Sequence, residues 1–108
     1  MRPAPDMSRV DFAYLESYVG GDRAIAAEVL VLFQAQAEGW RAALAAPGAG
    51  FRDVVHTMKG AAHGIGARTL GDVAARAELE GAGQAPLVLQ ALDAALSEID
   101  AYLTGDRT

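Results

Sequence analysis

Apolar side chains recur along this chain at spacings of three and four residues, a pattern typical of helices that bury one face. The clearest instance lies around residues 51–65, where the apolar members are Phe51, Val54, Val55, Met58, Ala61, Ala62 and Ile65. At about 100° of turn per residue, these side chains fall on one side of a helix. The opposite side carries Arg52, Asp53, His56, Lys59, Gly60 and His63. The pattern therefore predicts a helix with a packed face and an exposed face that bears two histidines.

Four more helices are expected around this one, at residues 8–19, at 23–46, from 67–69 to 82, and from 86 to about 103. Ser8 or Asp11 is a candidate cap for the first helix and Asp22 for the second, because short polar side chains bond to free backbone N–H groups there. Gly66 follows the central helix at 51–64, and glycine tolerates the left-handed conformation that ends helices. Pro86 suits the first turn of the last helix.

The apolar stripes of these helices define an expected core. The long second helix has a stripe of Ile25, Val29, Leu32, Phe33, Gln36, Trp40 and Leu44, widened by Leu30 and Val31. The fourth helix offers Leu70, Val73, Ala74 and Ala77, and the last offers Leu89, Leu92, Leu96, Ile99 and Leu103. Four substantial helices with short Gly-rich connections predict an all-α fold, an antiparallel up-down-up-down four-helix bundle with a short extra N-terminal helix. We expect one domain at residues 8–105 after a flexible segment at 1–7.

Composition narrows the classes of function. The chain has 108 residues, of which 52% are apolar, and a net charge of −5. An acidic chain without basic runs has no electrostatic reason to bind nucleic acid. It contains no cysteine, so disulfides and thiol chemistry are excluded. No apolar run reaches the roughly 18 residues of a membrane span, and no signal peptide is apparent, so we expect a cytoplasmic protein without membrane contact.

The exposed face of the central helix carries the candidate chemistry. A surface imidazole is largely neutral at cytosolic pH, given an ordinary pKa of about 6.5, and is nucleophilic at a ring nitrogen. Gly60 lies one turn after His56, where glycine costs about 1 kcal/mol relative to alanine in a helix. Its lack of a side chain leaves His56 accessible to another protein. Lys59 could compensate the charge of a phosphoryl group on His56. Alternatively, it is solvated or pairs with an acidic neighbour such as Asp53. His63 is either a contact or an idle surface residue.

This arrangement resembles the signature of histidine-containing phosphotransfer (HPt) domains. That signature reads roughly His-x-Leu-Lys-Gly-Ser/Ala-Ala/Ser, followed by a Gly-Ala pair and a leucine. The chain offers His56-Thr57-Met58-Lys59-Gly60-Ala61-Ala62, then Ile65-Gly66-Ala67 and Leu70, and similar residues at Val10-Asp11, Gly21-Asp22, Leu32-Phe33 and Ala77-Glu78. It departs from the pattern at Met58 and Ala77, where the family usually or often has leucine. Neither departure touches the candidate phosphoacceptor.

The resemblance implies a helical bundle that accepts a phosphoryl group from an aspartate of one receiver domain and passes it to another. His56 matches the phosphoacceptor, with Nε2 as the phosphorylated nitrogen. Lys59 matches the assisting lysine and Gly60 the glycine that leaves room for the receiver. Arg52 and His63 are further candidates for partner contact. The implied partners are receiver domains of response regulators or a hybrid histidine kinase. We expect a monomer with no cofactor and no metal, because magnesium belongs to the receiver.

Three other functions compete with phosphotransfer. A bundle that binds metal or haem is disfavoured because His56 and His63 are seven residues apart, whereas paired helical ligands are spaced by three or four. A histidine kinase needs an ATP-binding lobe and a Gly-rich phosphate loop, so we expect no ATP-dependent kinase activity from this chain. An adaptor that binds a receiver or kinase without accepting phosphate is disfavoured only by the presence of His56.

Overall fold

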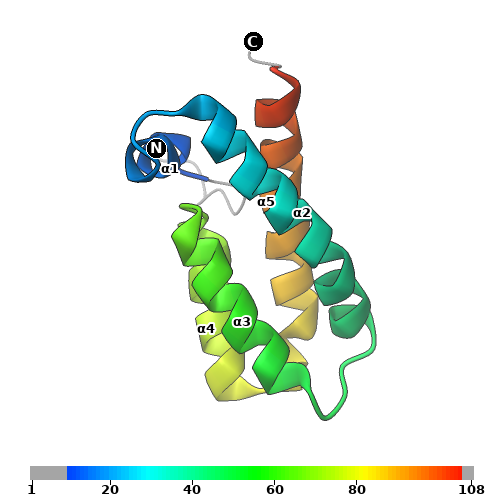
Figure 1. The fold of residues 1–108 in the computed structure, drawn as a ribbon. Helices are drawn as coiled ribbons and strands as arrows, with labels where there is room; N and C mark the ends of the chain where they lie inside the picture. The colour runs from blue at the N-terminus through cyan, green and yellow to red at the C-terminus, as the bar shows by residue number, and fades with distance from the viewer. Residues whose placement is uncertain (1–9, 106–108) are drawn as a thin grey trace, which may run out of the picture.

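The computed structural model describes residues 10–105, and its order of elements matches the predicted one. The helices are α1 (Phe12–Tyr18), α2 (Arg23–Ala45), α3 (Phe51–Gly64), α4 (Arg68–Glu80) and α5 (Ala85–Thr104), with a short 3-10 helix η1 (Ala82–Gln84) before α5. In Figure 1, α3 and α4 lie side by side, α5 lies behind α2, and α1 lies across one end. The predicted all-α four-helix bundle with a short N-terminal helix is confirmed.

Aspartates cap the first two helices, as predicted. The Oδ1 atom of Asp11 accepts the backbone N–H of Tyr14 at 3.0 Å. Asp22 accepts from two backbone N–H groups at the start of α2, at 3.0 and 3.2 Å. All three bonds satisfy donors that a helix leaves unpaired in its first turn. The alternative cap Ser8 and the predicted segment 1–7 lie outside the described residues.

The turn between α3 and α4 is fixed by Gly66, which follows the last helical residue and its cap. Gly66 has a φ of +87°, the left-handed conformation that the sequence predicts for it. The N–H of Ala67 bonds to the carbonyl of Ala62 at 2.8 Å, which closes the end of α3. The carbonyl of Gly66 also accepts the N–H of Asp11 at 2.9 Å. This turn therefore sets the position of α4 beside α3 and holds the start of α1.

Each of the five α-helices contributes to one apolar core. Its largest fully buried side chains are Leu15, Leu30, Val55, Met58, Leu70, Val88, Leu92 and Ile99. Within residues 10–105 no polar or charged residue is buried, and no buried side-chain nitrogen or oxygen lacks a partner. The same part of the chain contains no helix that is both long and apolar enough to cross a membrane. The bundle is held together by the apolar faces of its helices.

The buried face of α2 differs from the predicted stripe. Its buried residues are Ala26, Leu30, Phe33, Ala37, Trp40 and Leu44. Ile25 and Leu32 are instead 44% and 66% exposed. Val31 and Gln36, also predicted for the stripe, are exposed too. The prediction was wrong for these four because it favoured large side chains, whereas the fully buried Ala26 and Ala37 line the packed face. The shift leaves large apolar side chains of α2 on the surface.

The last helix shows the same use of small side chains. The predicted seam is buried at Leu92 and Ile99, but Leu89, Leu96 and Leu103 are only partly buried. The remaining buried positions of α5 are Ala85, Val88, Ala91 and Ala95. In α4, the predicted Leu70, Ala74 and Ala77 are buried and Val73 is partly buried. Alanines thus separate the helices less than leucines would, which gives close contacts throughout the bundle.

Candidate functional site

The α3 helix presents its histidines to the surface, as predicted. Phe51, Val55, Met58 and Ala62 are its buried residues. On the other side of the helix, the side chain of His56 is 64% exposed. The amphipathic pattern of α3 therefore decides the position of this imidazole, because burying Met58 turns His56 outward.

A carboxylate from the neighbouring helix orients the imidazole. Nδ1 of His56 lies 2.7 Å from Oε2 of Glu78, which belongs to α4. An ionised carboxylate can only accept hydrogen bonds, so Nδ1 is the donor and carries the ring proton. The other ring nitrogen, Nε2, then keeps its lone pair. The contact thus favours, for the neutral imidazole, the tautomer whose Nε2 is a nucleophile.

Lys59 shares the same carboxylate. Its Nζ donates to Oε1 of Glu78 at 2.8 Å, and its side chain is 32% exposed. The hydrogen bonds from Lys59 and His56 hold the pKa of Glu78 below its ordinary value, with Lys59 the larger cause. Lys59 is therefore paired with an acidic residue, one of the alternatives considered from sequence, but Asp53 was the wrong example because the partner comes from α4. One carboxylate links the ammonium and the imidazole.

Glu78 was not predicted from the sequence as a residue of the site. The sequence placed it only within the Ala77-Glu78 pair that resembles the family. A usable signal was its place at the edge of the apolar face of α4, next to the buried Ala77. An acidic side chain at such an edge lies near the helix that packs against it.

The second histidine is held differently. Nε2 of His63 lies 3.2 Å from Oδ1 of Asp72, and its side chain is 43% exposed. Its ring packs over Gly71, where an added Cβ atom would come within 2.3 Å of ring atoms. The Nε2 atom that is free in His56 is therefore engaged in His63. The structure brings both residues to the α3–α4 side, with opposite ring nitrogens bound.

The surface beside His56 is bare on the side away from Glu78. A Cβ atom at Gly60 or at Gly64 would meet no atom of the described chain within 4 Å. A packing role for Gly60 is thus excluded among the described residues. Arg52, one turn before His56, is exposed and forms no ion pair with any described residue. A second protein can approach the imidazole over these two glycines.

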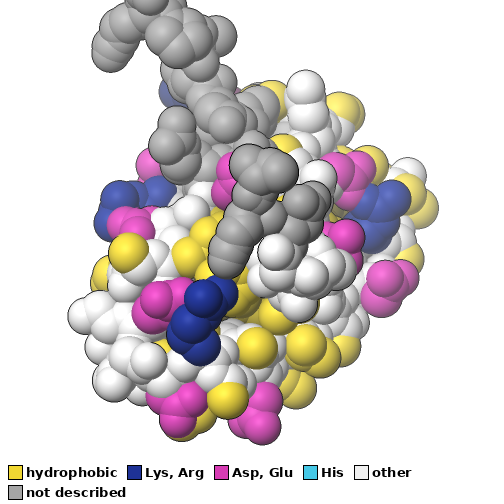
Figure 2. Space-filling view, turned by 90° about the horizontal axis from the view of Figure 1, so that it is seen from above, with side chains coloured by type: hydrophobic (Ala, Val, Ile, Leu, Met, Phe, Trp, Pro, Cys, Tyr) yellow, Lys and Arg dark blue, Asp and Glu magenta, His cyan; other side chains and the backbone are white. Residues whose placement is uncertain are grey.

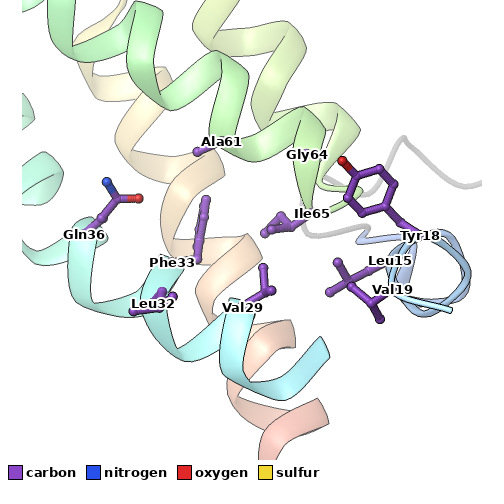
Figure 3. A pocket seen from close by; sticks show the side chains of 10 residues that line it. All are labelled: Leu15, Tyr18, Val19, Val29, Leu32, Phe33, Gln36, Ala61, Gly64 and Ile65. Atoms are coloured by element: carbon purple, nitrogen blue, oxygen red, sulfur yellow. The ribbon is translucent and has the colours of Figure 1, made fainter. Parts of the chain in front are cut away.

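An apolar hollow of about 280 Å³ opens between α1, α2 and α3 (Figure 3). It is lined by Leu15 and Tyr18 of α1 with the adjoining Val19, by Val29, Leu32, Phe33 and Gln36 of α2, and by Ala61 and Gly64 of α3 with the adjoining Ile65. Gly64 belongs both to this lining and to the bare surface that begins at Gly60. The hollow and the imidazole are therefore joined along α3.

The end of the bundle that carries α1 adjoins the end of α3, where the N–H of Asp11 bonds to the carbonyl of Gly66. Figure 2 views the molecule from that end, and no histidine is seen among the described residues of this face. Hydrophobic side chains lie there between charged ones of both signs. Within residues 10–105 no group of three or more His, Asp or Glu side chains is placed to hold a metal ion.

Comparisons with known proteins agree with this geometry. The model of the Hpt domain family matches residues 28–102. Among solved structures, the histidine phosphotransferase ShpA from Caulobacter crescentus is 47% identical, with a TM-score of 0.79. That match covers 89% of this chain and 91% of the other. The comparison with curated proteins gave no match. This chain, a helical bundle with an exposed histidine, therefore belongs to the Hpt domain family, whose model matches most of its length.

Proposed function

We propose that this protein relays phosphoryl groups through Nε2 of His56. It accepts the group from an aspartate of one receiver domain and passes it to an aspartate of another. The observation that carries this proposal is the 2.7 Å contact between Nδ1 of His56 and Glu78. In the neutral ring that contact places the proton on Nδ1 and leaves the lone pair on Nε2, and the side chain is 64% exposed. A phosphotransfer role in a phosphorelay follows from the family, and the residues and steps below are our proposal.

The transfer step follows from the tautomer. The lone pair of Nε2 attacks the phosphorus of an aspartyl phosphate, and an N–P bond forms while the P–O bond breaks. The electron pair of the broken bond leaves with the aspartate carboxylate. The ring then carries a positive charge, because Nδ1 keeps its proton, and the carboxylate of Glu78 faces that charge. In the return transfer the N–P bond breaks and a P–O bond to the second aspartate forms, which restores the same neutral tautomer of the ring.

Lys59 has a separate task in this proposal. The phosphoryl group brings negative charge to a surface site, and stabilising that charge is most of what a protein contributes to such a transfer. The ammonium of Lys59 is already held beside the imidazole through their shared carboxylate. Lys59 therefore supplies a positive charge from a position that it already occupies before phosphorylation. Glu78 is a positioning residue, since it acts through His56.

Receiver docking is proposed on the surface of α3 and α2 between His56 and the apolar hollow. Gly60 and Gly64 allow a partner to lie close to α3, and the hollow accepts an apolar side chain. Leu32 and Tyr18 are 66% and 75% exposed at its rim. Their burial would favour docking at about 25 cal/mol per Å² of apolar area. Arg52 is proposed as a contact at the polar edge of this surface.

His63 is not proposed as a phosphoacceptor. Asp72 engages its Nε2 atom at 3.2 Å, and Gly71 gives its ring a place against α4. Its role is to keep α4 in place and to offer its exposed edge to a partner. The proposed partners are receiver domains or a hybrid histidine kinase, met in the cytoplasm by a monomer. Neither nucleic acid nor a membrane takes part.

A transfer assay tests the proposal. Each receiver of the source organism is phosphorylated by its kinase, separated from it and mixed with the protein or with His56→Gln or His63→Gln variants. We expect at least one receiver to label the wild type and the His63→Gln variant, but not His56→Gln. A wild type that binds a receiver and stays unlabelled by all of them would be an adaptor, and the proposal would be wrong.

A further inference from the structure

The short helix α1 depends on its contacts for its position. It has seven residues, and among them only Leu15 is buried. A helix of this length is not stable alone in water, because nucleation costs more than so few hydrogen bonds return. Gly20 and Gly21 follow it with φ values of +72° and +83°, so the chain turns sharply before α2 begins. Something outside α1 must fix where it lies.

A cluster of four side chains joins α1 to the start of α2 and the end of α5. We call it the clasp, and it consists of Phe12, Glu16, Arg23 and Tyr102. The hydroxyl of Tyr102 donates to Oε2 of Glu16 at 2.5 Å. The ring of Tyr102 stacks on that of Phe12, with centroids 4.3 Å apart and planes 9° apart. Both contacts bind α1 to α5.

Arg23 closes the clasp from α2. Its Nε lies 3.5 Å from the same oxygen of Glu16, and its Cζ lies 4.9 Å from the ring centroid of Tyr102. Burial, followed by the bond to Glu16, raises the pKa of Tyr102 above its ordinary value. The phenol therefore stays a donor across the physiological pH range. One hydroxyl, one carboxylate and one guanidinium hold three helices together.

Two members of the clasp, Phe12 and Glu16, belong to α1, the helix that also forms one wall of the apolar hollow. Leu15 and Tyr18 of α1 and the adjoining Val19 line that hollow, while no member of the clasp does. Glu16 lies one residue after Leu15 and one turn before Val19. The contacts that hold Glu16 in place therefore also hold the α1 side of the hollow in place. The groups bonded around His56 come from α3 and α4, so the clasp has no contact with the proposed chemistry.

We infer that Tyr102, through Glu16, is a positioning residue for receiver docking. It holds α1 so that the hollow keeps the shape that a partner's apolar side chain fills, and it does not act on the transfer at His56. This inference rests on the proposed function. It separates two properties of the protein: the affinity for a phosphorylated receiver depends on the clasp, whereas the rate of transfer within the complex does not.

The test compares Tyr102→Phe with Tyr14→Phe. Both remove one phenol oxygen and keep the ring, but the hydroxyl of Tyr14 has no hydrogen bond to any described residue. For Tyr102→Phe we expect faster amide hydrogen exchange in α1 and a KM for the phosphorylated receiver about fivefold higher. That factor corresponds to one lost hydrogen bond of about 1 kcal/mol. We expect the maximum rate to stay unchanged and Tyr14→Phe to behave as wild type.

Other results overturn the inference. An unchanged KM and unchanged exchange in Tyr102→Phe would show that the clasp does not position α1 for docking. A lower maximum rate with an unchanged KM would show that it acts on the transfer instead. Failure of the wild type to accept phosphate from any receiver would contradict the proposed function itself, and that outcome is separate because it does not depend on either variant.

Discussion

Oε2 of Glu78 lies 2.7 Å from Nδ1 of His56, across the contact between α4 and α3. The carboxylate decides which ring nitrogen carries the proton, and it is itself shared with the ammonium of Lys59 at 2.8 Å. A single acidic residue thereby connects the proposed nucleophile to the proposed compensating charge. The chemistry assigned to His56 depends on α4 as much as on α3.

Replacing Glu78 by glutamine tests its contribution to transfer. The amide oxygen of Gln can still accept from Nδ1, but it lacks the negative charge that faces the ring when the ring becomes cationic. Bonds to charged groups are stronger than neutral ones by roughly 1 kcal/mol or more. We expect the rate of transfer within the complex to fall about tenfold. Single-turnover kinetics with a phosphorylated receiver measure it.

Glu80→Gln is the matched control for that variant. Glu80 belongs to the same helix and bonds to Arg76, outside the proposed site. Its replacement should leave the rate within about twofold of wild type, because exposed pairs contribute little. Equal rates for Glu78→Gln and Glu80→Gln would show that the charge beside Nδ1 is not used.

The lowered pKa of Glu78 predicts how stability changes with pH. A carboxyl group can have a lower pKa in the folded protein than in the unfolded chain. Such a group stabilises the fold at pH values above its ordinary pKa of about 4.3. That contribution is lost as the pH falls through the lower folded value. Urea unfolding should therefore show a stability difference between wild type and Glu78→Gln near pH 7 that disappears at about pH 3. The same difference at both pH values would contradict this assignment.

Lys59→Ala should separate charge compensation from folding. The variant removes the cation that shares the Glu78 carboxylate with His56, so we expect transfer to slow by about tenfold and the phosphorylated protein to lose its label faster. The Lys59–Glu78 pair is still partly exposed, with side chains 32% and 22% exposed, and such a pair contributes about 1 kcal/mol, so the melting temperature should fall by less than about 8 °C. Arg76→Ala, which removes a cation paired with Glu80, is the control and should transfer normally. A large loss of melting temperature would assign Lys59 to stability instead.

Gly60 offers a graded test of access. Alanine or glutamine at this position meets no described atom at Cβ and favours the helix by up to about 1 kcal/mol. We therefore expect both variants to melt at or above the wild-type temperature. Gly60→Ala should still be phosphorylated by the receiver, whereas Gly60→Gln should lose docking because its side chain covers the approach to His56. A destabilised Gly60→Gln, or one that transfers normally, would count against the proposed approach.

The sequence predicted the exposed histidine because α3 has one clear apolar face. Met58, Val55 and Phe51 are large and bury together, so the phase of the helix is unambiguous. In α2, large apolar residues occur nearly all round the helix, and size alone could not choose among them. The buried Ala26 and Ala37 decide the packing there, which leaves Ile25 and Leu32 exposed. Of these two, Leu32 lines the apolar hollow of the proposed docking surface.

The pattern of apolar residues could not predict which side chains of different helices contact each other. Glu78 is 22 residues from His56 and 19 from Lys59, so their meeting depends on how α3 and α4 pack. The same holds for His63, whose exposure was predicted but whose engagement by Asp72 over Gly71 was not. Periodicity assigns a residue to a face of its own helix, and it does not say which residue of another helix meets it.

Heteronuclear NMR of the phosphorylated protein, with nitrogen-15 in its histidines, tests the central claim most directly. The account predicts one phosphoryl group, coupled to Nε2 of His56, with the proton of that ring on Nδ1. A phosphoryl group on His63, or on Nδ1 of His56, would contradict it.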